Sequence, residues 1–174
     1  MADVPDYLVL RRHRDLAGRS WHPWVRRCLV LLLLVVAVLA LLNVFGQRPS
    51  SASAVAPEAS LKVYSPTSVR GGLLFEARFH VTARRELKDA ILVLNSGWLE
   101  GMTVNTIEPS PVNEASRSGR LTLELGHIPV GQSYILYVQF QVNPTNVGHR
   151  AQTVELDDGG RKILSLRRSI TVYP

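Results

Sequence analysis

Residues 133–143 read SYILYVQFQVN, and apolar and polar side chains alternate along this stretch. Successive side chains of a β-strand point to opposite faces of a sheet, so this alternation predicts a strand with one buried face. The apolar face would carry the side chains of Tyr134, Leu136, Val138, Phe140 and Val142. Helical spacing is not sustained anywhere after residue 60.

The same alternation recurs on both sides of this strand. Residues 75–83 read FEARFHVTA, residues 121–125 read LTLEL, and residues 90–94 form a continuous apolar run typical of a strand buried on both faces. Gly, Pro, Asn and Asp separate these runs. About seven strands are expected, near residues 61–65, 73–83, 88–95, 102–107, 120–125, 133–143 and a hairpin of 150–157 with 161–173. Residues 61–174 are therefore predicted to form an all-β immunoglobulin-like sandwich.

The segment LELGHIPVGQSYILYVQFQV, residues 123–142, also resembles the bacterial Ig-like conserved-repeat domains. In that family a strand ending in Leu-Gly leads through a Pro-x-Gly turn into a long alternating strand. The matching residues are Leu125, Gly126, Pro129, Gly131 and Ser133. The resemblance covers about 90 residues and rests on a structural motif. It implies surface display, adhesion or assembly without a common catalytic site.

A different pattern precedes the sandwich. Residues 28–47 contain no charged side chain, and Leu and Val dominate their first two thirds. A helix rises about 1.5 Å per residue, so about 20 residues cover the hydrocarbon core of a bilayer. The sequence predicts a transmembrane helix at 28–47 that contacts membrane lipid. Its predicted anchor residues are Leu29, Leu31, Leu34, Val38 and Leu42.

The charges that flank this segment predict its orientation. Arg26 and Arg27 adjoin its N-terminal end, and further arginines precede them, whereas Arg48 is the single cation close to the other end. Cationic flanks stay on the cytoplasmic side. Residues 1–27 are therefore predicted to be a basic cytoplasmic tail, and the sandwich to lie outside the cell membrane of a single-pass protein.

A cleaved signal peptide is the main alternative to a membrane anchor. Ala52, Ser53 and Ala54 form an A-x-A pattern, and cleavage after it would leave a mature chain that begins at Val55. The apolar run is longer than a typical signal-peptide core and ends well before this pattern, which favours the anchor. Residues 48–60, rich in Ser, Ala and Pro, are predicted to be a flexible linker.

Motifs for chemistry are absent from the sequence. There is no P-loop, G-x-S-x-G or H-E-x-x-H string, and the single cysteine, Cys28, excludes an intramolecular disulfide. No tight cluster of His and Cys predicts a metal site, so no metal, cofactor or small-molecule substrate is expected. The net charge of +6 is most concentrated beside the apolar segment, which argues against nucleic acid as a partner.

A few residues are candidates for contact with a partner. Trp98 could be an exposed aromatic anchor, or it could fold back to cover one end of the sandwich. Arg84 and Arg85 could face anionic headgroups or envelope polymers, or they could be charges that protect strand edges. The apolar stretch Tyr7–Leu10 could dock on a partner of the tail.

Three classes of function follow from this reading. The favoured class is a non-catalytic, membrane-anchored binding or assembly subunit whose Ig-like domain meets another membrane or envelope protein. The second is a cleaved and exported Ig-like binding module. The third is an accessory enzyme with an unrecognised site, which the missing motifs disfavour.

Overall fold

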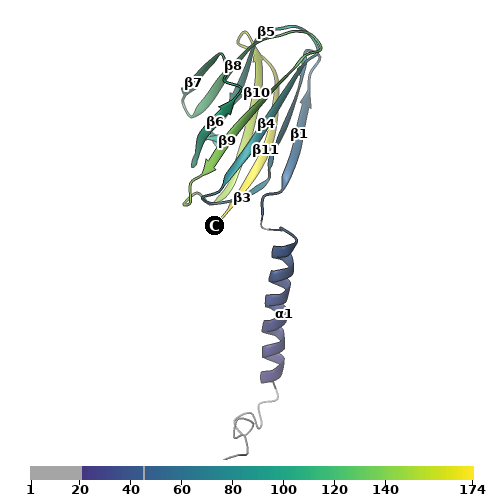
Figure 1. Cartoon of the computed structure of the whole chain (residues 1–174), viewed down its shortest axis with the longest axis vertical. Coiled ribbons are helices and arrows are strands. Elements are labelled where there is room, and N and C mark those ends of the chain that lie inside the picture. Colours follow the sequence, from purple (N-terminus) through teal and green to yellow (C-terminus); the bar gives the residue numbers. More distant parts are fainter. Residues whose placement is uncertain (1–20, 45) are drawn as a thin grey trace, which may run out of the picture. The chain divides into compact units, whose positions relative to one another are not determined.

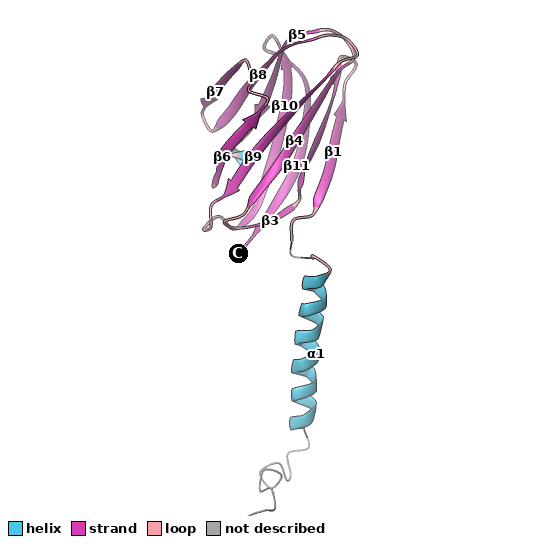
Figure 2. Ribbon diagram, in the orientation of Figure 1, coloured by secondary structure: helices cyan, strands magenta, loops and turns pink. Residues whose placement is uncertain are grey.

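The computed structural model describes residues 21–44 and 46–174, which form a helix and a separate β-rich unit (Figures 1 and 2). The predicted contact stretch Tyr7–Leu10 and most of the predicted tail of residues 1–27 lie outside the described residues. Among the described residues, Pro23–Leu41 is the one stretch of helix long and apolar enough to cross a membrane, judged by length and composition.

Helix α1 spans His22–Leu41 and has a proline in its first turn, where a missing N–H costs no hydrogen bond. Its C-terminal end is closed by Asn43, which has a left-handed φ of 53° and donates its N–H to the carbonyl of Ala40. The N–H of Val44 donates to the carbonyl of Leu39, which completes a Schellman motif.

The predicted helix of residues 28–47 was therefore wrong at both ends. The helix begins at His22, before Arg26 and Arg27. Arginine and tryptophan are compatible with helical backbone, so the helix extends beyond the uncharged segment that was used to predict it. It ends at Leu41, because the Asn43 turn stops it although the uncharged sequence continues. Leu42 is the C-cap residue, whereas the other predicted anchor residues lie within α1.

In residues 46–174 as described, eleven strands form two packed sheets, which confirms the predicted immunoglobulin-like sandwich but corrects the predicted number of about seven strands. The five-stranded sheet contains, in spatial order, β1 (Pro49–Val55), β2 (Ala59–Pro66), β4 (Leu74–Ala83), β9 (Ser133–Val142) and β6 (Met102–Glu108). The six-stranded sheet contains β3 (Ser68–Arg70), β11 (Arg161–Tyr173), β10 (Gly148–Asp158), β5 (Leu87–Leu94), β8 (Arg120–Ile128) and β7 (Asn113–Arg117).

Strand β1 is the largest departure from the predicted organisation. Residues 48–60 were predicted to be a flexible linker, but residues 49–55 pair with β2 in an antiparallel ladder. The side chains of Ala52 and Ala54 are half-buried against the core, while Ser51 and Ser53 are exposed. An edge strand packs only one face on the core, and in β1 that face carries small alanine side chains. The sequence of β1 therefore has the Ser- and Ala-rich composition of a flexible linker.

The residues before β1 are also fixed to the sandwich. The hydroxyl of Ser68 donates to the carbonyl of Gly46 at 2.8 Å, and the side-chain amide of Gln47 donates to the carbonyl of Leu74 at 2.8 Å. The N–H of Thr67 donates to the carbonyl of Arg48. The sandwich therefore begins at about Gly46, well before the predicted boundary at residue 61.

The chain crosses from one sheet to the other between β2 and β3. At this crossing β3 joins the six-stranded sheet beside β11, in the one parallel pairing among the described strands. The guanidinium of Arg168 on β11 donates to the carbonyls of Ser65 and Pro66, at 2.9 and 3.0 Å. These bonds tie β11 to the last two residues of β2, directly before the chain crosses between the sheets.

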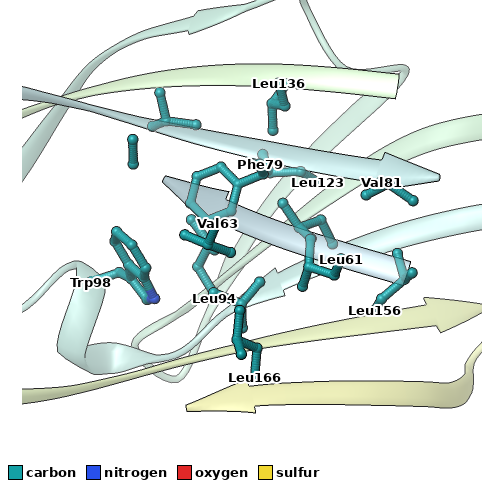
Figure 3. Close-up of a cluster of buried hydrophobic side chains, with 14 of the residues drawn as sticks. Leu61, Val63, Phe79, Val81, Leu94, Trp98, Leu123, Leu136, Leu156 and Leu166 are labelled. Carbon is teal, nitrogen blue, oxygen red and sulfur yellow. The ribbon is translucent and has the colours of Figure 1, made fainter. Parts of the chain in front are cut away.

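Between the sheets lies a core of aliphatic and aromatic side chains (Figure 3). Trp98, in the short 3₁₀ turn Ser96–Trp98 after β5, has no exposed surface and packs on Phe79 and Phe140 with ring centroids 5.3 and 5.5 Å apart. The inward side chains of β4 and β9 complete this layer, as their alternation predicted.

Candidate interaction surface

Three exposed side chains form a row across the outer face of the five-stranded sheet. Tyr64 on β2 is in register with Arg78 on β4, which is in register with Tyr137 on β9. The guanidinium carbon of Arg78 lies 5.4 Å from the ring centroid of Tyr64 and 5.5 Å from that of Tyr137. The arginine therefore makes a cation–π contact with each tyrosine. We call Tyr64, Arg78 and Tyr137 the tyrosine row.

Glu76 holds Arg78 in place. Residues two apart on a strand share a face, and the Nε of Arg78 donates to the Oε1 of Glu76 at 2.9 Å. This hydrogen bond, followed by the negative charge of Glu76, raises the pKa of Arg78 above its ordinary value. The guanidinium is charged at any physiological pH and lies between the two rings.

A shallow pocket of about 250 Å³ lies beside the tyrosine row. Its lining comes from three neighbouring strands and consists of Glu76, Thr106, Glu108, Tyr137 and Gln139. Tyr137 thus borders both Arg78 and the pocket. The pocket offers carboxylates, an amide and a hydroxyl group around one aromatic ring, which suits hydrogen bonding to a partner surface.

The two rings are exposed although they are large and partly apolar. Tyr64 is 40% exposed and Tyr137 is 38% exposed, and Ile135 on the same face is 39% exposed. Tyrosine and arginine are enriched among the residues that dominate the energy of protein–protein interfaces. A rigid sheet holds these side chains, so little conformational entropy remains to be lost on binding.

The outer face of the six-stranded sheet has a different character. A larger hollow of about 600 Å³ is lined there by Asn95, Arg120, Thr153, Glu155, Lys162, Ser165 and Arg167. Every lining side chain is polar or charged, none is aromatic, and Lys162 is paired with Glu155. Lys162 and Glu155 are thus occupied by each other, and this face lacks the exposed aromatic rings that are enriched at interfaces.

The candidate contact residues Trp98, Arg84 and Arg85 lie in different environments in the structure. Trp98 is fully buried, which excludes the exposed anchor and bears out the other reading of the sequence, that this side chain packs against the sandwich. Arg84 and Arg85 are exposed in the turn after β4, where their N–H groups donate to the carbonyl of Glu58. They lie beyond the far end of β4 and are not part of the tyrosine row.

Sequence reasoning missed the tyrosine row. The alternation did place Tyr137 and Arg78 on the polar faces of their strands, but it did not show that these faces belong to neighbouring strands. A tyrosine at an outward position of a strand is a usable signal, because most outward positions here carry polar or small side chains. Register between strands was the missing information.

A metal site is not evident in the described residues, since no group of three His, Cys, Asp or Glu side chains converges there. Asp157 and Asp158 do not gather further acidic ligands; Asp158 instead accepts a hydrogen bond from the N–H of Asp89 at 2.8 Å. The pKa of Asp157 is raised, chiefly by burial and then by the neighbouring Glu155.

Comparison with known proteins gives no family. No family model matches the chain, and no curated protein matches it. Among solved structures it is similar to CaCohA2 from Clostridium acetobutylicum, with a TM-score of 0.48, 17% identity, and coverage of 67% of this chain and 92% of that one.

Two further structures are similar at comparable levels. A CARDB domain from Pyrococcus furiosus has a TM-score of 0.43 and 14% identity, with coverage of 71% of this chain and 95% of that one. AvmM, which catalyses macrocyclization in alchivemycin A biosynthesis, has a TM-score of 0.45 and 8% identity, with coverage of 74% and 90%. These values do not identify the conserved-repeat family, so that relationship stays a resemblance.

Proposed function

We propose that this chain is a non-catalytic, membrane-anchored binding module that presents an Ig-like domain outside the cytoplasmic membrane. The observation that carries the proposal is the tyrosine row, an exposed and preorganised arginine between two aromatic rings. Its composition matches protein interfaces, so the proposed partner is another membrane or envelope protein.

The anchor is α1. Its twenty residues give a length of about 30 Å; the first six, up to Arg27, are assigned to the headgroup level, and the uncharged segment of residues 28–47 begins directly after them and continues beyond the last turn of the helix. Arg26 and Arg27 lie near its N-terminal end, and Trp24 stacks on the Arg27 guanidinium at 5.3 Å, an arrangement suited to the headgroup level. We assign residues before Arg26 to the cytoplasm on the basis of this charge.

Strand β1 argues against the cleaved, exported form. Cleavage after Ala54 would remove six of the seven residues of β1, from Pro49 to Ala54, and these residues pair with Ser65, Tyr64 and their neighbours on β2. The loss would expose the edge of β2 and uncover the core beneath Ala52 and Ala54. A sandwich that uses this segment as a strand favours its retention in the mature protein.

Membrane retention tests the anchor. Membranes from cells that express a C-terminally tagged chain would be washed with carbonate, and the N-terminus of the chain identified by mass spectrometry. We expect an intact chain in the membrane pellet. A soluble chain that begins near Val55 would overturn the anchor and replace it with the exported form.

Partner capture tests the binding face. Extraction in mild detergent should recover a stoichiometric protein partner, and Tyr137→Ala should weaken its affinity about 30-fold, the effect of losing about 2 kcal/mol at a hot spot. Arg78→Ala should act in the same direction. Arg167→Ala on the opposite face is the matched control and should leave affinity unchanged. Equal effects of Arg78→Ala and Arg167→Ala would contradict this binding face.

A further inference from the structure

A groove runs along the free edge of the five-stranded sheet. Among the described strands, β6 is the last of this sheet and pairs only with β9, and β7 is the last of the other sheet and pairs only with β8. Between them lies a hollow of about 500 Å³. Two continuous segments line it, residues 104–107 of β6 and residues 110–114 before and at the start of β7. Because consecutive residues form each wall, the walls include main chain.

The direction of the main-chain groups on β6 follows from the hydrogen bonds of β9. The N–H and C=O groups of alternate residues in a strand point to opposite neighbours. The N–H of Val142 donates to Leu73, on the β4 side, whereas the N–H of Asn143 donates to Gly101, on the β6 side. The odd-numbered residues of β9 therefore bond to β6.

The register then identifies which residues of β6 have main-chain groups that face the groove. The residues paired with odd-numbered positions of β9 are Thr103, Thr106 and Glu108. Val104 and Ile107 pair with Phe140 and Val138, so their N–H and C=O groups point away from β9. Both residues line the groove, and their side chains pack on the core. They thus offer two donors and two acceptors to a strand that lies alongside.

The opposite wall supplies apolar surface and negative charge. Val112 is 75% exposed, more than any other large hydrophobic side chain of the described sandwich. Glu114 is the one charged residue of the lining. Glu108, the last residue of β6, directly follows the lining residues 104–107 in the sequence. The lining contains no Lys or Arg, in a chain whose net charge is +6. A basic segment with a small apolar side chain is the complementary ligand.

We propose that this groove binds an extended, basic peptide segment of a protein partner, which joins the five-stranded sheet as an added strand beside β6. Main-chain hydrogen bonds to Val104 and Ile107 would hold the segment, and an apolar side chain would cover Val112. The site is distinct from the tyrosine row and does not depend on α1 crossing a membrane.

Alternate N-methylation of a probe peptide tests the main-chain contacts. The probe is a fluorescent seven-residue peptide that alternates valine with lysine and threonine, titrated to millimolar concentration onto the full chain in detergent. Two control peptides carry N-methyl groups on the odd or on the even residues. Only one edge of an added strand faces β6, so one control should lose about tenfold in affinity and the other should match the parent. Equal binding by both controls would overturn the proposal.

Hydrogen exchange locates the contact on the protein. Saturating probe should slow exchange at the amides of Val104 and Ile107, and leave that of Thr106, which already faces β9, unchanged. No protection of Val104 and Ile107 at millimolar probe would overturn the proposal. Protection that exists without probe and is lost on dilution would also overturn it, since the edge would then belong to a second copy of this chain.

Two protein variants complete the test. Val104→Pro removes the outward N–H at a position where an edge strand tolerates proline, and should abolish probe binding; Val104→Thr keeps the N–H and should retain it. Circular dichroism would verify that both variants fold. Glu114→Gln should weaken binding of the lysine-containing probe but not of a version with threonine in place of lysine. Retained binding by a folded Val104→Pro variant would contradict strand addition.

Discussion

Two arginines of this domain stack on aromatic rings, one inside the sandwich and one outside it. Arg168 lies 5.7 Å from the ring of Trp98, and its guanidinium is bonded to carbonyls at the sheet crossing. Arg78 lies between two exposed tyrosines and is bonded to Glu76. Burial lowers the pKa of Arg168, whereas hydrogen bonding to Glu76 raises that of Arg78.

An arginine stacked on an aromatic ring therefore has a different role in each place, and the burial of the ring decides whether the contact serves the fold or a partner. In the inner stack Trp98 is fully buried and Arg168 is half-buried and bonded to main-chain carbonyls, so its contribution is to the fold. The outer stack covers little core, so its loss should be tolerated by the fold and felt by a partner. Mutations at these positions separate stability from binding.

Trp98→Ala should have the largest effect on stability. The side chain is fully buried among Phe79, Phe140 and the guanidinium of Arg168, and its removal leaves a cavity. The expected loss is about 3 to 5 kcal/mol, measured by urea unfolding of the full chain in detergent. Trp98→Phe, which keeps a ring in the cluster, is the control and should lose less. Equal stability of Trp98→Ala and the unmodified chain would contradict its role in the core.

Arg168→Ala should have the next largest effect, about 1 to 3 kcal/mol, because the carbonyls of Ser65 and Pro66 lose a charged donor. Arg168→Met keeps an unbranched stem over Trp98 and removes the charge. The difference between the two variants in urea unfolding measures packing by the stem. If both variants match the unmodified chain, the guanidinium does not stabilise the sheet crossing.

Tyr137→Ala should change stability by less than about 1 kcal/mol, the range of a cross-strand pair on a solvated face. Tyr64→Ala should behave in the same way, because both rings are more than a third exposed. The midpoint of urea unfolding checks this expectation. A loss as large as that of Trp98→Ala would erase the distinction between the outer and inner stacks.

Asp157→Asn should have the smallest effect, and one that depends on pH. Burial, and then Glu155, raise the pKa of Asp157 in the folded state above the ordinary value of 3.8. The folded state thus holds this proton to higher pH, and stability falls as pH rises from 3.8 through the raised pKa. The asparagine variant lacks this loss, so it should be slightly more stable than the unmodified chain at pH 7 and equal to it below pH 3.8. The measurement is the urea midpoint of both proteins at the two pH values. A lower midpoint for Asp157→Asn than for the unmodified chain at pH 7 would contradict the expectation.

Strands with long apolar side chains on one face could be predicted from the sequence, and strands without them could not. In β4 and β9 alternate Phe, Val and Leu side chains are buried, which makes the period of two visible. Strand β7 is exposed along its whole length, and β1 packs only alanines on the core. Neither produces an apolar period, because edge strands obtain most of their order from pairing with a neighbour.

The candidate surface depended on information that the sequence does not contain. Tyr64 and Tyr137 are 73 residues apart in the sequence, and they flank Arg78 only because the registers of two ladders agree. Trp98 is a second case, since its position in a loop left both exposure and packing against the sandwich open. Its burial follows from the 3₁₀ turn, which directs the ring between the sheets.

The position of β1 has a mechanical consequence. Tension on the chain before the sandwich first meets the hydrogen bonds of Gly46 and Gln47, and a pull directed along the axis of β1 would reach Pro49 after them. The ladder of seven register pairs with β2, from Pro49↔Pro66 to Val55↔Ser60, would then be loaded in shear. In shear the hydrogen bonds of a ladder share the load and must break together, whereas a pull across the ladder breaks them one pair at a time. Under a pull along the strand, a segment with the composition of a flexible linker would therefore act as a clamp.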